Sequence, residues 1–400
     1  MSSTEFLSNT QNNEPANLRI TAWDIDPTGH NYGDAVTELI RSEREVPVQI
    51  NIDQSLRAKV IDSCGLTCNF CHNEGTPVAS DNSTTVALTT KPGRSGRVSA
   101  FSETNGVNFL PGKMAAEPSF RESLALLRDG LGLSELHLTG GEPTLHTGLA
   151  DLIAMARSEG YSVRMTSNGE RGGVAIPDCA AAGLDKINFS IFGTTPEELA
   201  EVQHARYQDV GRAQRKIDAL HESIAIAVAN GVGVAANVVM GDTSHSERVL
   251  RLINEFDSKL SVRVLPDLGK GTESYYAIYQ LLADIGAVPT KAFIDAGSSN
   301  ARVSYQLPSG RTIFFKQIRP ARLNETCNTC AFNNGSDCKE GFYGIRLYKD
   351  KQGEYKVGVC IQRMDLTMPI EEFMLSGLYN EVRAMREKDF ADLHKYYPES

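Results

Sequence analysis

Hydrophobic positions follow two alternating patterns through the middle of the chain. Between Leu56 and Pro266, short β-rich runs such as KINFSIF and VAANVVM alternate with longer amphipathic segments. In SERVLRLINEF, for example, Val249, Ile253 and Phe256 recur at helical spacing. About six such strand and helix units can be counted, and this repetition is typical of a parallel sheet. The pattern predicts an α/β fold, a partial (β/α)6 TIM-like barrel whose site lies at the C-terminal strand ends.

The segments on either side of this repeat have other patterns. A helix is predicted near Asp34–Arg41 and a strand near Val46–Ile52, and the chain closes with a helical stretch at about Ile370–His394. Residues 76–112 are rich in Ser, Thr, Gly and Asn, so they form either a long loop over the site or a disordered insertion. The expected division is a disordered N-terminus (1–16), an N-terminal extension (17–52), the barrel core (53–266) and a smaller cysteine-rich α+β domain (267–400).

Composition narrows the function classes. A net charge of -10 and a pI near 5.4 disfavour nonspecific binding to nucleic acid or to an anionic membrane. The chain has no signal-peptide pattern at its start and no long apolar run, so we expect a cytoplasmic protein without a membrane partner. Its eight cysteines would stay mostly reduced there, which favours metal binding over disulfides.

Three of the cysteines form a compact group. SCGLTCNFCHNEG places Cys64, Cys68 and Cys71 in a C-x3-C-x2-C pattern directly after the strand RAKVID. Thiolate is a soft ligand suited to zinc or to iron-sulfur clusters. Three thiolates leave a four-iron cluster with one open site, which can bind a small chelating molecule. The alternative is a zinc site completed by His72 or by a distant residue.

The next strand ends carry further polar motifs. LTGGEPT places Gly140 and Gly141 where backbone can approach a ligand closely, followed by Glu142, whose carboxylate could receive an ammonium group. TSNG and Ser190 of KINFSIF follow at later strand ends, although TSNG can also be a simple turn and Ser190 can satisfy a backbone group. His137 alternates with apolar neighbours and is expected to pack or to make a hydrogen bond.

Over roughly Arg57 to Pro266, these motifs resemble the radical S-adenosylmethionine (SAM) superfamily. The resemblance implies that the cysteine triplet holds a [4Fe-4S] cluster whose unique iron chelates the methionine moiety of SAM. It also implies reductive cleavage of SAM to a 5′-deoxyadenosyl radical, with electrons from a donor such as flavodoxin or ferredoxin. The implied SAM contacts are Phe70, Gly140, Gly141, Glu142, Thr166, Ser167, Asn168 and Ser190.

A second cysteine group follows the predicted barrel. Cys327 and Cys330 form a C-x2-C pair, with Cys338 and Cys360 downstream. This spacing indicates a metal site without identifying the metal, so structural zinc and an auxiliary [4Fe-4S] cluster both remain open. The remaining Cys179 is expected to be a small buried hydrophobe.

The C-terminal half resembles the GTP 3′,8-cyclase family of molybdenum cofactor biosynthesis, with its auxiliary-cluster domain of the SPASM or twitch kind. The resemblance is carried by LRAKVIDSC, SVRVLPDLG, IRL and GEYKVGVC. It implies a second cluster on Cys327, Cys330 and Cys360, with Cys338 inside an insertion or serving as a fourth ligand. It also implies that Arg57 contacts a substrate phosphate.

The chain departs from that family at several positions. An insertion replaces the Arg-x-Arg pair after the second cysteine and leaves Arg346 as a counterpart, and Ala235 stands in place of a lysine. The sequence ends in Tyr-Pro-Glu-Ser instead of two glycines. Arg263, at the sixth strand end, joins Arg57 as a candidate contact for a polar substrate.

Four functions are therefore compatible with the sequence. The leading one is a radical SAM enzyme that acts on a small polar molecule, which could be a nucleotide, a sugar or a specialised metabolite. GTP 3′,8-cyclase and a peptide-modifying radical SAM enzyme are the alternatives within the same class. A metal-binding scaffold is the non-enzymatic alternative, but it has no need of LTGGEPT or TSNG.

Overall fold

The computed structural model describes residues 18–26, 33–68, 110, 112–203, 205–330, 333, 338, 341–361 and 363–398. The predicted disorder of residues 1–16 and almost all of the predicted loop at 76–112 lie outside these ranges. Among the described helices, none is long and apolar enough to span a membrane.

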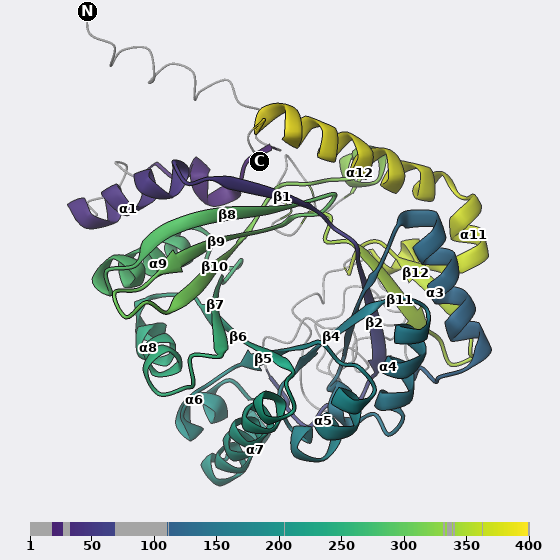
Figure 1. Ribbon diagram of the computed structural model, residues 1–400, viewed down its shortest axis with the longest axis horizontal. Helices are drawn as coiled ribbons and strands as arrows, with labels where there is room; N and C mark the ends of the chain where they lie inside the picture. The colour runs from purple at the N-terminus through teal and green to yellow at the C-terminus, as the bar shows by residue number, and fades with distance from the viewer. Residues whose placement is uncertain are drawn as a thin grey trace, which may run out of the picture.

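Six parallel strands form the centre of the molecule, as the hydrophobic pattern predicts. Each pairs with the next in chain order, and helices on the outside connect them (Figure 1). The α/β fold class is thereby confirmed. The strands are β2 (Ser55–Ile61), β3 (Glu135–Gly140), β4 (Ser162–Ser167), β5 (Lys186–Ile191), β6 (Gly233–Met240) and β7 (Leu260–Pro266). The helices around them are α3 (Pro118–Leu131), α4 (Leu149–Ser158), α5 (Gly172–Ala181), α6 (Pro196–Glu201), α7 (Val210–Ala229), α8 (Ser246–Asn254) and α9 (Thr272–Asp284).

Further strands extend this sheet at both edges. Next to β7, the order continues through β10 (Thr312–Ile318), β9 (Asn300–Gln306) and β8 (Val288–Ala296) to β1 (Val48–Ile52). Next to β2 lie β11 (Ile345–Lys349), β12 (Tyr355–Gly358) and β13 (Met368–Pro369), which gives 13 strands within the described residues. Figure 1 shows the sheet curled into a ring, with β1 and β8 to β10 across the side that six strands alone would leave open.

The flanking helices agree with the pattern in type and differ in their bounds. The predicted N-terminal helix is α1 (Asp34–Arg44), and the predicted C-terminal stretch is divided into α11 (Ile370–Leu375) and α12 (Gly377–Tyr396). The division falls at Ser376, whose side chain accepts a hydrogen bond from the Tyr379 amide and caps α12. The remaining elements are α10 (Asn324–Asn328) and the 3-10 helices η3 (Thr21–Asp24), η4 (Pro143–Leu145), η5 (Ala205–Tyr207), η6 (Thr243–His245) and η8 (Met364–Leu366).

Alternation along the barrel strands separates two environments. On β5, Ile187, Phe189 and Ile191 are buried in the hydrophobic core. The residues that alternate with them, Lys186, Asn188 and Ser190, are polar. Because successive side chains of a strand point to opposite faces and the helices lie outside the ring, the polar set faces inward. The interior of the barrel is therefore lined by polar and charged side chains.

A buried ion pair fixes α12 on the outside of the sheet. Arg319 follows β10 and is fully buried, and its guanidinium donates to the carboxylate of Asp389 on α12. Asp389 also accepts from the Gly297 amide at 2.7 Å, directly after β8. The pair thus holds three segments together, and loss of one partner would leave the other charge buried.

A buried carboxylate joins the N-terminal extension to the added strands. Glu43 of α1 accepts hydrogen bonds from the indole of Trp23, the hydroxyls of Tyr279 and Tyr305, and the amide of Gln317. Its surroundings exclude water completely, and this burial raises the pKa of Glu43 to about 7 despite the four donors. Folding therefore depends on pH at this position.

We expect Glu43→Gln to flatten the pH dependence of stability. The folded chain retains a proton on Glu43 that the unfolded chain releases between its ordinary pKa of 4.5 and a pKa of about 7. The stabilisation is complete below this window and is lost as the pH rises through it, which amounts to about 3 kcal/mol. Urea denaturation at a series of pH values measures the slope. The exposed Glu45→Gln is the matched control, and an equal slope in wild type and Glu43→Gln would contradict the assignment.

Candidate functional site

Two cysteines of the triplet lie on the loop that follows β2. Cys68 is buried and Cys64 is partly exposed. The Asn168 amide nitrogen lies 3.5 Å from the sulfur of Cys64, and the Gln203 amide nitrogen lies 3.5 Å from the sulfur of Cys68. Cys71, His72 and the predicted adenine contact Phe70 lie outside the described residues. The three-cysteine set therefore remains a prediction for its third member.

Side chains from three other segments hold this loop in place. The Gly65 amide donates to Glu170 at 2.8 Å, and its carbonyl accepts from Arg212 of α7 at 2.9 Å. The Thr67 amide donates to the side-chain oxygen of Gln203 at 2.7 Å. Glu170 also forms an ion pair with Lys216 of α7. The polar turn after β4 and the start of α7 thus fix the loop that carries the cysteines.

The two glycines of LTGGEPT pack against the backbone of the same loop. The amides of Gly141 and Glu142 donate to the carbonyls of Ile61 and Ser63, each at 2.8 Å. A Cβ atom added at Gly141 would lie 2.2 Å from the Ser63 carbonyl oxygen. Gly140 adopts a φ of 139°, which other residues rarely adopt, and its Cβ would meet the Ile61 carbonyl at 2.4 Å. The sequence predicts that these glycines let the backbone approach a ligand. In the described residues, the group that they approach is the backbone of the cysteine loop.

Glu142 joins the ends of β3 and β4. One carboxylate oxygen accepts from the amide and hydroxyl of Thr144 and from the Ser167 hydroxyl, and the other accepts from the Asn168 amide at 2.5 Å. Burial raises the pKa of Glu142, although these four donors favour its charged form. The second oxygen retains acceptor capacity for an ammonium group, because a carboxylate oxygen can take two donors.

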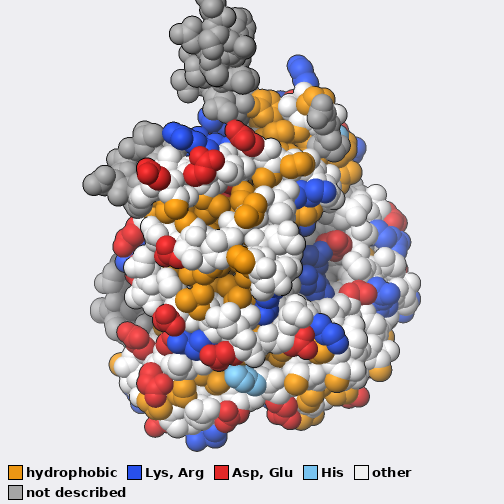
Figure 2. Space-filling view, turned by 60° about the vertical axis from the view of Figure 1, so that its left-hand side comes forward, with side chains coloured by type: hydrophobic (Ala, Val, Ile, Leu, Met, Phe, Trp, Pro, Cys, Tyr) orange, Lys and Arg blue, Asp and Glu red, His pale blue; other side chains and the backbone are white. Residues whose placement is uncertain are grey.

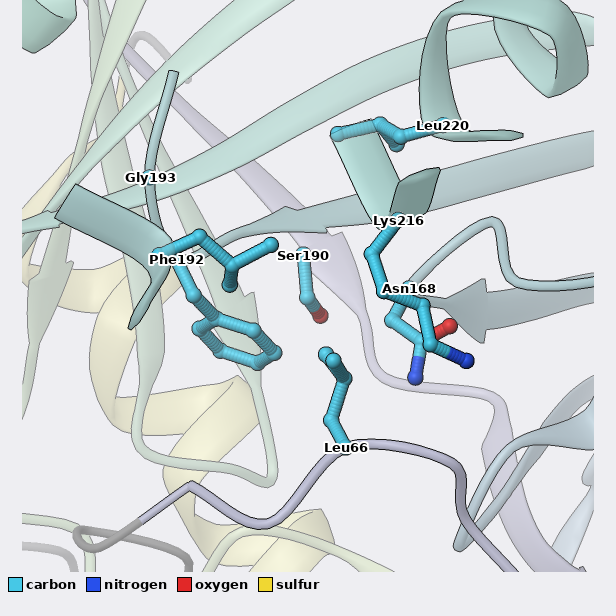
Figure 3. A pocket seen from close by; sticks show the side chains of 8 residues that line it. Leu66, Asn168, Ser190, Phe192, Gly193, Lys216 and Leu220 are labelled. Carbon is cyan, nitrogen blue, oxygen red and sulfur yellow. The ribbon is translucent and has the colours of Figure 1, made fainter. Parts of the chain in front are cut away.

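A small cavity lies beside the cysteine loop (Figure 3). Two predicted SAM contacts, Asn168 and Ser190, lie on its wall, and Figure 3 shows the Ser190 hydroxyl directed towards Leu66 of the cysteine loop. Thr166, another predicted SAM contact, does not line this cavity. Its hydroxyl lies 2.8 Å from the ring of His137, and this contact confirms the hydrogen bond expected for that histidine. The lining residues that sequence reasoning missed are Leu66, Phe192, Gly193, Leu199, Lys216 and Leu220.

Basic side chains gather inside the barrel. His137 of β3 is buried, and its pKa lies well below the ordinary value, first because of burial and then because Arg57, Lys316 and Arg263 are near. The ring of Tyr343 lies 4.8 Å from the Arg57 guanidinium and 4.7 Å from the Lys316 ammonium. The structure thus brings the predicted Arg57 and Arg263 together and adds Lys316 of β10. Figure 2 shows Lys and Arg side chains in a hollow of the surface.

More cations extend this group along the inward face. The pKa of Lys186 is lowered to about 8 by burial and by the nearby Arg263, Arg164 and Arg302. Burial lowers the pKa of Arg263 to about 10. Asp295 lies 3.6 Å from Arg302 and compensates part of this charge. Within the described residues, the interior therefore has an excess of positive charge.

Two arginines in this group have unsatisfied donors. The Nε atoms of Arg57 and Arg263 are buried without a hydrogen-bond partner among the described residues. Such groups are costly to bury unless a ligand or water satisfies them. Arg346 is paired with Arg57 in the register of β11 and β2, and burial lowers its pKa to about 10. Two of the three predicted substrate arginines, Arg57 and Arg346, therefore lie on neighbouring strands.

The second cysteine group lies around α10. Burial raises the pKa of Cys327 first, and the nearby Cys338 and Cys330 raise it further, so these three thiols are neighbours. The Gly341 amide donates to the sulfur of Cys338 at 3.4 Å. Cys360 follows β12 and lies near Arg346. No three metal-binding side chains of the described residues converge to ligand distance, and whether three or four cysteines bind one cluster stays open.

Buried Cys179 packs in the hydrophobic core on α5, as predicted. Burial raises the pKa of its thiol to about 12. This cysteine is therefore separate from both candidate clusters.

Residues 59–256 match the family model described as the radical SAM superfamily. The chain contains a radical SAM domain. This finding confirms the enzyme class that the cysteine triplet and LTGGEPT indicate, and with it the SAM and [4Fe-4S] cofactors characteristic of that family. The match begins within β2 and ends just after α8.

Curated relatives extend the similarity over most of the chain. A probable GTP 3′,8-cyclase of Metallosphaera sedula is 25% identical over 355 residues, covering 86% of this chain and 95% of the relative. One from Thermoplasma volcanium is 25% identical over 348 residues, covering 83% and 89%. Among solved structures, Streptococcus suis SuiB bound to S-adenosylmethionine shares 12% identity and a TM-score of 0.45, covering 87% and 71%. The radical SAM protein is thus similar to GTP 3′,8-cyclases in sequence.

We expect Gly141→Ala to disturb the cysteine loop. Its Cβ would displace the Ser63 and Asp62 carbonyls, and such overpacking costs on the order of 1–3 kcal/mol. Denaturant unfolding measures this loss, and iron content after anaerobic reconstitution reports on the loop. Gly211→Ala in the first turn of α7 is the control, because its Cβ meets only a side-chain atom at 3.5 Å. Equal stability and iron content in both variants would show that the loop does not depend on the glycine.

Proposed function

We propose that Cys64, Cys68 and Cys71 hold a [4Fe-4S] cluster and that the neighbouring cavity receives the nucleoside part of SAM. Asn168 carries this proposal, because its side chain reaches the sulfur of Cys64 and also lines the cavity. Leu66 of the cysteine loop lines the same cavity. The radical SAM match covers these residues and supports their joint assignment.

The donors present fit the two cofactors. Thiolates suit an iron-sulfur cluster, and the cavity combines apolar walls from Phe192 and Leu199 with the polar groups of Asn168 and Ser190. This combination suits a heterocycle linked to a sugar. When bound, the cluster and SAM together supply a 5′-deoxyadenosyl radical that abstracts hydrogen from a substrate. The chain positions both groups.

Glu142 and the surrounding turns have a positioning task in this proposal. The fixed carboxylate receives the SAM ammonium group at the end of β3, where a single acceptor site of its second oxygen is free for it. Ser167 and Thr144 orient the carboxylate through the first oxygen. The glycines of LTGGEPT let the cysteine loop lie close enough for this arrangement.

The cationic interior indicates a small anionic substrate. Arg57 and Arg263 present buried, unsatisfied donors, and Lys316 adds a charge beside them. Arginine side chains bind phosphate well, because their forked donors match its oxygens. The low pKa of His137 keeps its ring neutral near pH 7, so it contributes hydrogen bonding instead of another charge. We therefore propose a phosphate-bearing substrate, such as a nucleotide or a sugar phosphate.

GTP 3′,8-cyclase is the second candidate, supported by relatives of that name at 25% identity over most of the chain. Ala235 replaces a family lysine, but Lys186 stands on the neighbouring strand β5 and faces the same interior. The positive charge of Lys186 therefore lies one strand away from the position of the family lysine. A peptide substrate has no comparable support in the described residues.

The remaining assignments follow from the same chemistry. The second cysteine group would hold an auxiliary [4Fe-4S] cluster on Cys327, Cys330 and Cys360, with Cys338 as a possible additional ligand beside them. The neighbouring positions of Cys327, Cys330 and Cys338 support a thiolate site there. An external one-electron donor such as flavodoxin or ferredoxin would reduce the enzyme in the cytoplasm.

We expect the reconstituted, reduced protein to convert SAM to 5′-deoxyadenosine and the Cys64→Ala/Cys68→Ala/Cys71→Ala variant to form none. Without the three thiolates, the cluster has no protein ligands and SAM is not reduced. Liquid chromatography with mass spectrometry measures the product in the presence and absence of GTP. Cys179→Ala is the control, because this thiol lies in the core. No product from a wild-type protein with a fully loaded, reducible cluster in either condition would count against the proposal.

We expect Arg263→Met/Lys316→Met to weaken binding of GTP at least about tenfold, because each lost charge removes a phosphate contact of roughly 1 kcal/mol or more. Guanosine, which lacks phosphate, should bind both proteins equally. Isothermal titration calorimetry measures the affinities of GTP, guanosine and inorganic triphosphate. Lys291→Met is the control, since Lys291 is an exposed residue of β8. Unchanged affinity for both phosphate ligands in the double variant would rule out this phosphate site.

A further inference from the structure

Two side-chain amides approach the sulfurs of the cysteine loop from different segments. Asn168, after β4, lies 3.5 Å from Cys64, and Gln203, after α6, lies 3.5 Å from Cys68. Nothing in the sequence pattern connects Gln203 with the cysteines, because 135 residues separate it from Cys68. The two contacts form one arrangement in which each described cysteine of the triplet has its own amide neighbour.

The hydrogen bonds of each amide oxygen determine that nitrogen faces sulfur. The Asn168 side-chain oxygen accepts from the Glu170 backbone amide at 2.9 Å. The Gln203 side-chain oxygen accepts from the Thr67 amide at 2.7 Å and from the Thr67 hydroxyl at 3.2 Å. A backbone N–H can only donate, so these oxygens cannot exchange places with the nitrogens. Each sulfur therefore meets an N–H donor.

Gln203 is also fixed through its backbone. It is buried, with 6% of its surface exposed, and it forms an isolated β-bridge with Cys68. Its donor is thus held in place by contacts within the protein. A preorganised donor in a site that excludes water interacts more strongly with charge than an exposed one.

Such donors affect the two oxidation states of a cluster differently. One-electron reduction adds negative charge to the iron-sulfur unit, part of which resides on the thiolate sulfurs. An N–H group directed at these sulfurs stabilises the reduced state more than the oxidised state and raises the reduction potential. Removing the donor should lower the potential without removing a ligand.

We infer that Asn168 and Gln203 are positioning residues that raise the reduction potential of the SAM-binding cluster through their N–H contacts with Cys64 and Cys68. This inference rests on the proposed function, in which the triplet holds that cluster. The higher potential brings the cluster closer to the range of an external one-electron donor. The two amides thereby make reduction, the first requirement of the reaction, easier.

The test uses isosteric replacements in the reconstituted full-length protein. Gln203→Glu keeps the oxygen that accepts from Thr67 and replaces the donor to Cys68, and Asn168→Asp does the same beside Cys64. Gln208→Glu introduces the same charge five positions further on, at an exposed amide that contacts backbone carbonyls. A redox titration monitored by electron paramagnetic resonance follows the signal that SAM alters, so the second cluster is not mistaken for the first.

Each donor-removing variant should lower the ratio of reduced to oxidised cluster at a fixed potential about tenfold, equivalent to a shift of about 59 mV for one electron. Gln208→Glu should change the ratio less than about twofold, because water screens an exposed charge. Equal ratios in all four proteins, or an equal shift in Gln208→Glu, would overturn the inference. So would loss of the cluster from both donor-removing variants, since the amides would then only hold the loop. A wild type without any SAM-sensitive cluster would instead refute the proposed function.

Discussion

The two-residue period of the barrel strands is the constraint on which the rest of the structure depends. In a sheet curled into a ring with helices outside, one set of side chains joins the core and the other faces inward. On β5 the outward set is apolar, whereas the inward set includes Lys186, Asn188 and Ser190. A shift of one residue would place these polar groups against the helices. The same period that builds the core therefore also creates the charged interior.

The cysteine loop is held by polar contacts from several segments of the chain. Backbone from LTGGEPT, the carboxylate of Glu170 and the guanidinium of Arg212 all hydrogen-bond to it. The contacts therefore offset part of the conformational entropy that the cysteine loop loses when it is ordered. Cofactor binding then has less of this entropy cost to offset.

The sequence predicted the elements whose pattern is local. Buried strands such as KINFSIF and the motifs at their ends were recognisable because composition and spacing within a few residues determine them. Lys316 and Arg302 were missed, because β10 joins the barrel only through long-range pairing with β7, and β9 joins it only through β10. Gln203 was missed because its contact with Cys68 joins residues that are 135 positions apart in the chain. The glycines of LTGGEPT were recognised as places of close approach, but pattern alone could not show that the approaching group is the backbone of residues 61–63.

The pairing of β1 with β8 has a consequence for how the chain reaches its native state. Asn51 of β1 contacts Asp295 of β8, although 244 residues separate them. Contacts of such separation form late, because the entropy of closing a long loop must be overcome first. During synthesis, β1 waits without its partner until β8 has left the ribosome. The ring and its charged interior therefore exist only in the nearly complete chain, which limits the time for which a half-built site could bind metal or substrate.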